Sequence, residues 1–180
     1  MTDTTKASAR TSHGAVKIAP MTGTADERAF YDLNAEWITA HFEMEPSDVQ
    51  ILNHPHREVI EPGGQVYLAH REGRPVGCVA LMAYGPGVYK VAKMAVSPDH
   101  RGQGTGRQLM VHAMEQARRL GAQTLYLASS SRLVPAIALY TSLGFQRLSA
   151  EKWPFARFAR ADVFMCLTLG SQEAGVSDAT

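Results

Sequence analysis

The spacing of apolar residues divides the chain into strand-like and helix-like segments. In the first half, short continuous apolar runs lie between turns that contain Gly or Pro, a pattern typical of β-strands. These runs predict strands at residues 16–19, 65–70, 75–83 and 89–96. The reversal at Glu72-Gly73 indicates that the second and third of these strands form an antiparallel hairpin.

Two helices are expected between the first two strands. The longer one has apolar side chains near a helical period, and its start is predicted at the capping box Thr-Ala-Asp-Glu of residues 24–27. Its end is expected near His41. A shorter helix is predicted from Ser47 to the residue before Pro55. The apolar positions of the longer helix are Phe30, Leu33, Trp37 and Ile38.

Helix-like and strand-like segments alternate in the second half of the chain. Helices are predicted at residues 104–120 and 133–143, and strands at 124–128, 145–148 and 161–169. This order follows the hairpin of the first half. Together the two halves indicate an α/β or α+β fold in which a mixed sheet carries helices on both faces.

The composition is that of an ordinary globular protein. The chain has 180 residues, with 18 Lys and Arg against 17 Asp and Glu, and 45% of its residues are apolar. This balance argues against a nucleic-acid-binding protein, because neutralising phosphates usually requires a basic patch. Residues 15–169 are expected to form one domain between two disordered polar tails, residues 1–14 and 170–180.

Cysteine usage and the lack of long apolar segments indicate the compartment. Cys78 and Cys166 are too few for a disulfide framework and are expected to be buried thiols. No run of about 18 apolar residues predicts a membrane-spanning helix. The amino terminus lacks the apolar stretch of a secretory signal. We therefore expect a cytoplasmic protein without a membrane partner.

The segment between the strand at 89–96 and the following helix carries the most chemical information. Gly102, Gly104 and Gly106 lie where the chain turns into the helix, so successive backbone amides are left open to a ligand. Such a turn at a helix N-terminus favours phosphate oxygens, and Arg101 and Arg107 add positive charge. The spacing fits neither a Walker A loop nor a dinucleotide fingerprint. A turn that only starts a helix is the alternative.

Two motifs resemble those of the GNAT superfamily of acyl-CoA-dependent N-acetyltransferases. Arg101-Gly-Gln-Gly-Thr-Gly106 is similar to the signature R/Q-x-x-G-x-G/A, and residues 136–145 are similar to A-x-x-x-Y-x-x-x-G-F. The resemblance covers roughly residues 15–169. It implies a mixed, mostly antiparallel sheet of about seven strands, with helices on both faces and two strands splayed apart to form a slot for acetyl-CoA.

The resemblance also implies roles for individual residues. Tyr140 matches the tyrosine that protonates the leaving thiolate, so it is expected to be the general acid. Ser130 lies where relatives often have an Asn that holds the pantetheine. The pantetheine arm is expected along the strand end Met94, Ala95 and Val96. The pyrophosphate is expected on the loop amides, with Arg107 close by, and the residues of this loop are Arg101, Gly102, Gln103, Gly104, Thr105 and Gly106.

The sequence departs from the family pattern at the general base. Lys90 stands where many relatives have a Glu, and it cannot serve as a base while it is protonated. The candidate bases are Glu43, Glu45 and Asp48, with Glu151 further off. The first three would also favour a cationic acceptor, whereas Arg57 or Arg157 would bind a carboxylate instead. His54 and His56 flank Pro55, but no third ligand accompanies them, so no metal site is predicted.

Three functions remain open at this stage. The first is transfer of an acetyl group from acetyl-CoA to a primary amine, which is an amino acid, a small amine or a peptide N-terminus. The second is a non-catalytic acyl-CoA-binding or sensing domain, and the third is an unrelated phosphate-binding protein. The aromatic and basic segment 153–160 lines either the acceptor site or a homodimer surface, or it is a hairpin loop with packing aromatics.

Overall fold

The seven strands of the described part of the chain form one open sheet. A computed structural model describes residues 14–170, so the tails expected at 1–14 and 170–180 lie, apart from Gly14 and Gly170, outside it. Every neighbouring pair of strands is antiparallel except β4 and β5. In spatial order the strands are β1 (Lys17–Pro20), β2 (Gln65–Arg71), β3 (Arg74–Ala83), β4 (Val88–Val96), β5 (Thr124–Ser129), β7 (Val163–Thr168) and β6 (Gln146–Leu148).

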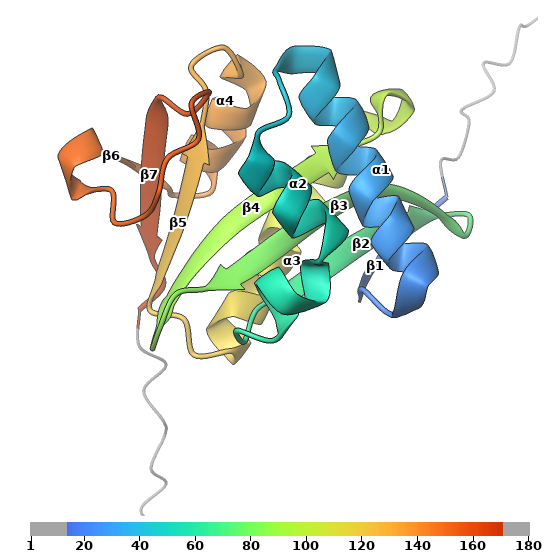
Figure 1. Ribbon diagram of the computed structural model, residues 1–180, viewed down its shortest axis with the longest axis horizontal. Helices are drawn as coiled ribbons and strands as arrows, with labels where there is room; N and C mark the ends of the chain where they lie inside the picture. Colours follow the sequence, from blue (N-terminus) through green and yellow to red (C-terminus); the bar gives the residue numbers. More distant parts are fainter. Residues whose placement is uncertain (1–13, 171–180) are drawn as a thin grey trace, which may run out of the picture.

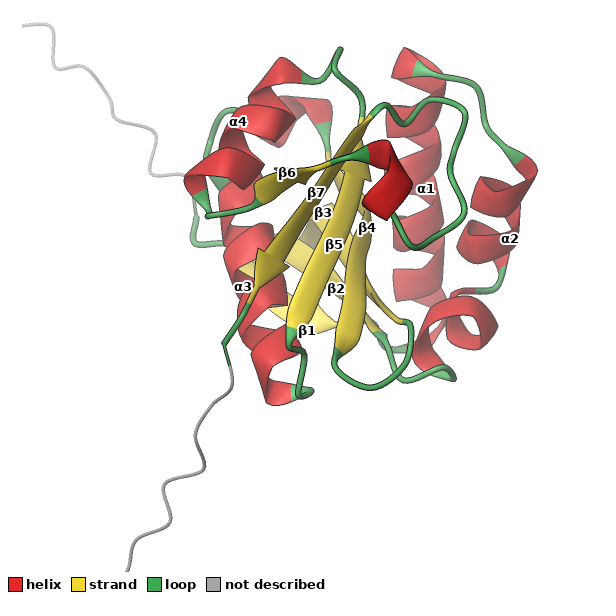
Figure 2. Cartoon of the chain, turned by 90° about the vertical axis from the view of Figure 1, so that its left-hand side faces the viewer, coloured by secondary structure: helices red, strands yellow, loops and turns green. Residues whose placement is uncertain are grey.

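Helices cover both faces of this sheet, as the sequence predicts. One face carries α1 (Gly23–His41) and α2 (Pro46–Asn53), and the other carries α3 (Thr105–Arg119) and α4 (Val134–Ser142) (Figures 1 and 2). A π-helical turn, His56–Ile60, follows α2 and was not expected. The sheet thus has two apolar layers, each built from the buried stripe of a helix and the side chains of one sheet face.

Different sets of buried side chains form the two apolar layers. Phe30 and Ile38 of α1 pack with Val66 and Leu68 of β2 on one face. On the other face, Leu109, Ala113 and Ala117 of α3 follow the helical period and are fully buried. Gly77 lets α3 approach the sheet, because a Cβ at this residue would lie 2.9 Å from a methyl of Leu109.

The start of α1 differs from the prediction. The capping box was expected at residues 24–27, but the helix begins at Gly23 with Thr22 as its N-cap. The backbone amide of Thr22 donates to the Asp26 carboxylate at 2.7 Å, and the Thr22 hydroxyl lies 3.2 Å from the same oxygen. An Asp four residues on therefore replaces the expected Glu27 contact, which the short motif alone could not distinguish.

A bulge distorts β4 in its second half. Lys93 has a positive φ of 50°, and the register between β3 and β4 shifts between Cys78 and Ala80. Two residues of β4 therefore stand opposite one residue of β3. The bulge turns the Lys93 side chain toward the α1 and α2 face, where it is buried.

Strands β4 and β5 separate after a short paired region. Their parallel pairing covers only Val88 to Lys90 against Thr124 to Tyr126. Beyond this point β5 continues to pair with β7 as far as Ser129, while β4 continues to pair with β3. The two strands diverge toward the upper end of the molecule in Figure 1. The expected splay is thus present, and it opens the sheet at one edge of the β4–β5 seam.

Candidate functional site

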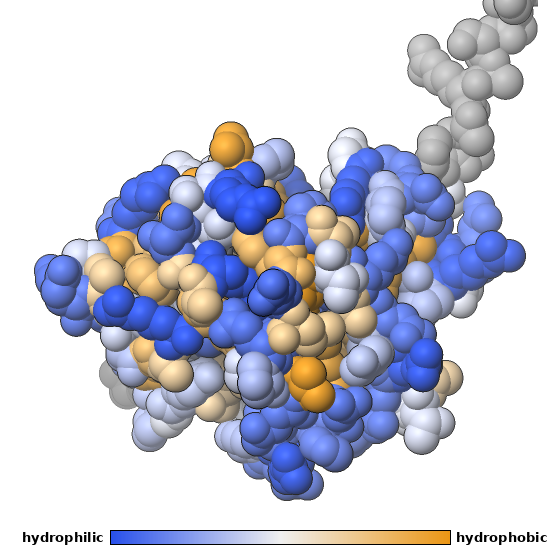
Figure 3. Space-filling view, turned by 45° about the horizontal axis from the view of Figure 1, so that its top comes forward, coloured by the Kyte–Doolittle hydropathy of each residue, from blue (hydrophilic) through white to orange (hydrophobic). Residues whose placement is uncertain are grey.

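A cavity of about 480 Å³ lies where β4 and β5 separate. Its walls come from the second half of β4, the end of β5, the first turns of α4, the last turn of α1 and the loop before β7. Figure 3 brings the upper end of Figure 1 forward and shows hydrophobic side chains between hydrophilic ones on this face. Of the residues predicted for the coenzyme, Met94, Ala95, Val96, Arg101 and Ser130 line the cavity.

Only the first residue of the glycine-rich loop, Arg101, lines the cavity, and the predicted loop residues 102–107 lie beyond its wall at the start of α3. Gly102 and Gly104 have φ angles of 70° and 81°, a left-handed conformation that strains any residue with a Cβ. Gly106 packs closely on β4, since a Cβ there would lie 3.2 Å from the flexible end of the Met94 side chain. The three glycines therefore shape the turn and let it pack closely on β4.

Backbone amides at the start of α3 are free to bind an anion. Gln108 makes the first backbone hydrogen bond of this helix, to the Gly104 carbonyl at 3.0 Å. The amides of Thr105, Gly106 and Arg107 precede it and have no acceptor within the helix. Because the helix N-terminus also carries partial positive charge, the start of α3 suits phosphate oxygens.

Side chains hold the loop in place. Arg101 donates through Nε to the Val96 carbonyl at 3.0 Å. The Gln103 side chain accepts from the buried Arg71 guanidinium and donates to the Asp99 carbonyl at 2.8 Å. The Arg107 guanidinium donates to the Ser142 hydroxyl at 2.9 Å, which ties α3 to α4. The side chains of Gln103 and Arg107 thus bond to other protein groups. The backbone amides of this loop are therefore the groups that remain free to bind a ligand.

Tyr140 lies on α4 and lines the cavity. Its ring packs edge-on against Phe145, with centroids 6.3 Å apart. Burial raises the pKa of Tyr140 to about 12. The hydroxyl therefore keeps its proton at neutral pH and is available as a donor to a group that becomes negatively charged.

His41 lies at the end of the cavity formed by α1. Its Nδ1 is 2.9 Å from the Trp37 carbonyl, and its ring stacks on the Trp37 ring with centroids 5.3 Å apart. A carbonyl can only accept a hydrogen bond, so Nδ1 carries the proton and Nε2 of the neutral ring is an acceptor. Sequence reasoning took this residue only as the end of a helix.

A buried ion network lies behind the cavity wall. The Lys93 ammonium is 2.7 Å from Asp48, and Arg160 donates to Asp48 at 2.7 Å and to Glu45 at 2.9 Å. Burial alone would raise the pKa of Asp48, but the hydrogen bonds from Arg160 and the charge of Lys93 outweigh it and lower this pKa to about 2. Burial lowers the pKa of Lys93, and Asp48 partly offsets that effect.

Lys90 lines the cavity on the same face and is 5% exposed. Its ammonium lies 5.4 to 5.9 Å from the ring centroids of four aromatic side chains. Burial, and then repulsion from Lys93 and Arg160, lower the pKa of Lys90 to about 8. The four rings belong to Tyr84, Trp153, Phe155 and Phe158.

The residues predicted for the acceptor lie outside the cavity wall. Glu43 is exposed, and Glu45 accepts hydrogen bonds from Arg160 and from the Ala159 amide. Arg157 donates to the Ala150 carbonyl at 2.5 Å. Four further residues line the cavity, and the sequence predicted no role in binding or catalysis for any of them. Their basic or aromatic side chains are the only signal in the sequence that could have indicated them. These residues are His41, Arg132, Phe42 and Lys93.

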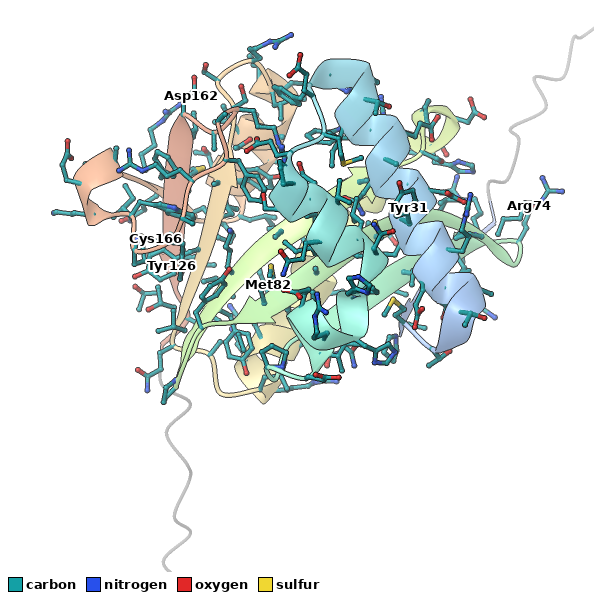
Figure 4. All side chains as sticks on the ribbon, in the orientation of Figure 1. Tyr31, Arg74, Met82, Tyr126, Asp162 and Cys166 are labelled. Atoms are coloured by element: carbon teal, nitrogen blue, oxygen red, sulfur yellow. The ribbon has the colours of Figure 1, made fainter. Side chains whose placement is uncertain are left out.

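The three consecutive serines, residues 129–131, have different contacts. The Ser131 amide and hydroxyl both donate to Asp162, which precedes β7 (Figure 4). Ser129 and Ser130 instead line the cavity.

The two described cysteines are free thiols, and Cys166 lies opposite Tyr126 in the β5–β7 pair (Figure 4). Among residues 14–170, no three His, Cys, Asp or Glu side chains are grouped to hold a metal. No helix in that range is long and apolar enough to span a bilayer.

Sequence comparison identifies relatives of this chain. Residues 62–147 match the family model of the acetyltransferase (GNAT) domain. The chain is 25% identical over 120 residues to the uncharacterized N-acetyltransferase YvbK of Bacillus subtilis, covering 65% of this chain and 77% of that one. It is 35% identical over 91 residues to the uncharacterized N-acetyltransferase YjgM of Escherichia coli, covering 49% of this chain and 54% of that one. The chain thus spans about half the length of the second relative.

Solved structures share the fold. A GNAT-family acetyltransferase from Staphylococcus aureus superposes with a TM-score of 0.80 at 17% identity, covering 87% of this chain and all (100%) of that one. YncA from Salmonella typhimurium, solved with its cofactor acetyl-CoA, superposes with a TM-score of 0.67 at 22% identity and covers 93% and 100% of the two chains. On the matched domain, the splayed sheet and the glycine-rich loop, this protein belongs to the GNAT superfamily of acetyltransferases.

Proposed function

We propose that this protein transfers an acetyl group from acetyl-CoA directly to a primary amine. The observation that carries the proposal is the cavity between β4 and β5, which is lined by Tyr140 and by Arg101, the first residue of the glycine-rich loop. An acyl-CoA needs both features, because its pyrophosphate is anionic and its thiol must be protonated on leaving. The acetyl-CoA bound by YncA, which has the same fold, supports the choice of coenzyme.

The coenzyme would lie along β4. Its pyrophosphate would accept hydrogen bonds from the amides that precede Gln108, with Arg101 nearby. Its pantetheine arm would occupy the open edge of β4 at Met94 to Val96, where pairing with β5 has ended. Ser130, on the opposite wall, offers a hydroxyl to the same arm.

The reaction then needs no covalent enzyme intermediate. The lone pair of the neutral amine forms a bond to the thioester carbonyl carbon, and the carbon–sulfur bond breaks as the tetrahedral intermediate collapses. The thiolate takes a proton from Tyr140, whose raised pKa keeps that proton in place until it is needed. The phenolate regains a proton from solvent. Cys78 is fully buried and takes no part.

The acceptor amine must also lose a proton, because an alkyl ammonium ion has no lone pair for the attack. No carboxylate lines the cavity in the part of the chain that the structure describes. Nε2 of His41 is the acceptor that the geometry supports best, since Nδ1 is committed to the Trp37 carbonyl. His41 therefore takes the place of the missing Glu at Lys90.

A second candidate function is acyl-CoA sensing without catalysis. The presence of Lys90 where relatives often carry a Glu favours it. Both functions predict that acetyl-CoA stabilises the folded protein, by about 2.7 kcal/mol at a hundred-fold excess over Kd. A melting temperature that does not move at millimolar acetyl-CoA would exclude both functions.

Release of free CoA separates the two functions. The purified protein is incubated with acetyl-CoA and, one at a time, with amino acids, small amines and short peptides, and thiol is measured against a control without acceptor. Acceptor-dependent thiol together with the N-acetylated product supports the enzyme. Stabilisation by acetyl-CoA without thiol release from any acceptor would support the sensor instead.

A further inference from the structure

The ionisable side chains on the acceptor side of the cavity are basic. Lys90 and Lys93 come from β4, Arg132 from the loop after β5, and Arg160 from the loop before β7. No Asp or Glu lies on the cavity wall within residues 14–170. Segments distant in the sequence thus bring four cations to one end of one cavity.

Two phenylalanine rings connect these cations. The Arg132 guanidinium lies 5.2 Å from the Phe42 ring centroid and that of Arg160 lies 6.0 Å from it. Around the Phe158 ring lie Arg160 at 4.5 Å, Lys93 at 4.4 Å and Lys90 at 5.4 Å. Arg160 contacts both rings, so the two phenylalanines link the four cations in a row from Lys90 to Arg132. The Trp37 ring lies beside Phe42, with centroids 5.8 Å apart.

Only two of the four cations are neutralised by the protein. Lys93 and Arg160 pair with Asp48 and Glu45 behind the wall. Lys90 and Arg132 have no carboxylate within ion-pair distance among the described residues. Lys90 is buried, so its charge is costly without a counter-charge, and an anionic ligand would remove that cost, whereas Arg132 is exposed.

We propose that the acceptor is a small amine that also carries a carboxylate, bound in the cavity beside the Phe42 and Phe158 rings, with the buried Lys90 as its counter-charge and the exposed Arg132 adding positive charge at the cavity wall. This inference rests on the proposed function and names its substrate class. A carboxylate that reaches Lys90 supplies the counter-charge that this buried ammonium lacks, and the aromatic rings pack against the apolar part of the acceptor. A purely cationic amine would meet two unneutralised positive charges and is rejected.

The carboxylates expected to bind a cationic acceptor do not face the cavity. Glu45 and Asp48 are engaged by Arg160, and Glu43 is exposed outside the wall. These carboxylates therefore do not neutralise the positive charges of Lys90 and Arg132.

The first test measures anion binding without catalysis. Trp37 lines the cavity, so its fluorescence reports occupancy. The protein is saturated with CoA and titrated with phenylacetate and with 2-phenylethylamine, which share a ring and differ in charge. We expect phenylacetate to bind about ten-fold more tightly or better. Equal or tighter binding of the amine would overturn the inference, as would loss of phenylacetate binding on adding CoA, because the cations would then serve the coenzyme.

Variants locate the binding site of the anion. Lys90→Met is expected to weaken phenylacetate binding by about ten-fold, and Arg132→Gln, at a more exposed residue, by about three-fold. Arg118→Gln is the matched control, because Arg118 is exposed in the last turn of α3 and does not line the cavity. Circular dichroism melts establish that each variant is folded. Unchanged affinity in both cavity variants would contradict the assignment.

The second test separates this inference from the proposed function. Acetyl transfer is measured to L-phenylalanine, L-phenylalaninamide and 2-phenylethylamine. We expect kcat/KM to be about ten-fold higher or more for the amino acid than for either neutral-tailed amine, and Lys90→Met to reduce that preference. Equal transfer to all three would refute the carboxylate site and leave the transferase intact. Transfer to none of these three or of the acceptor panel, with selective phenylacetate binding retained, would refute the transferase and leave the anion site intact.

Discussion

The Lys93 ammonium lies 2.7 Å from the Asp48 carboxylate and joins the bulge of β4 to the first turn of α2. Both side chains are buried, and Arg160 adds two hydrogen bonds to the same carboxylate. One carboxylate thus holds together a strand, a helix and the loop that covers the cavity. The cavity wall depends on this contact.

Replacing Asp48 should destabilise the fold. Asp48→Asn leaves Lys93 buried without a counter-charge, so we expect the free energy of unfolding to fall by about 3–5 kcal/mol in urea titrations. The matched control is Asp32→Asn, which removes an exposed ion pair with Arg28 and should cost less than about 1 kcal/mol. Equal losses in the two variants would contradict a structural role for the buried pair.

The same carboxylate predicts an acid-sensitive component of stability. The pKa of Asp48 is about 2 in the folded protein, against 3.8 for an unperturbed Asp. The unfolded state therefore binds the proton more readily, so the stabilisation is complete above about pH 4 and is lost as pH falls toward 2. The difference in unfolding free energy between the wild type and Asp48→Asn should shrink over this range.

Replacing Lys90 should have the opposite effect on stability. The pKa of Lys90 is about 8 in the folded protein and 10.5 when unperturbed, so its charged form disfavours folding below about pH 8. Lys90→Met should raise the free energy of unfolding at pH 7 by about 1–3 kcal/mol. This gain should disappear as pH rises from 8 to 10.5. Lys152→Met, at an exposed residue, is the control and should change little at any pH.

Tyr140→Phe tests the general acid. Removing the hydroxyl leaves the thiolate without its proton donor, so turnover should fall by about 10²-fold while the Kd for acetyl-CoA stays nearly constant. Tyr126→Phe provides the control, because Tyr126 lies on β5 but does not line the cavity (Figure 4). Unchanged turnover in Tyr140→Phe would exclude the acid role.

His41→Asn tests the general base. The Asn amide can still donate to the Trp37 carbonyl in place of Nδ1, but it has no counterpart to Nε2. The variant should therefore lose about 10²-fold in kcat/KM while the Kd for acetyl-CoA stays nearly constant. His56→Asn, whose ring lies outside the cavity beside Glu27, should retain the wild-type rate. An unchanged kcat/KM in His41→Asn would assign the base elsewhere.

Two glycines with the same backbone conformation separate coenzyme binding from stability. Gly104 and Gly121 both have a φ of 81°. Either substitution by Ala should cost about 1 kcal/mol of folding free energy, since Ala is strained at positive φ. Only Gly104→Ala should also weaken CoA binding in calorimetry, because it disturbs the amides at the start of α3. Equal CoA affinities in both variants would contradict the loop as the pyrophosphate site.

The sequence determined the order of the elements because their signals are local. The helical period of Leu109, Ala113 and Ala117 predicted the buried face of α3, and the apolar runs located all seven strands to within a few residues. The Gly-rich motif also predicted the binding loop, because a turn into a helix depends on neighbours in the chain. The cap of α1 was misplaced by two residues, since Thr22 and Thr24 each offer a capping sequence.

Only the tertiary structure decided which side chains face the cavity. Glu45 reads as an acceptor ligand in the sequence, yet it pairs with Arg160 from a segment more than a hundred residues away. The bulge at Lys93 and the separation of β4 from β5 depend on neighbouring strands rather than on local propensity. The positive charge of the cavity likewise comes from β4 and from two loops that are distant from it in the sequence. A pattern along the chain records what each segment can form, whereas ion pairs and cavity walls depend on which segments meet in space.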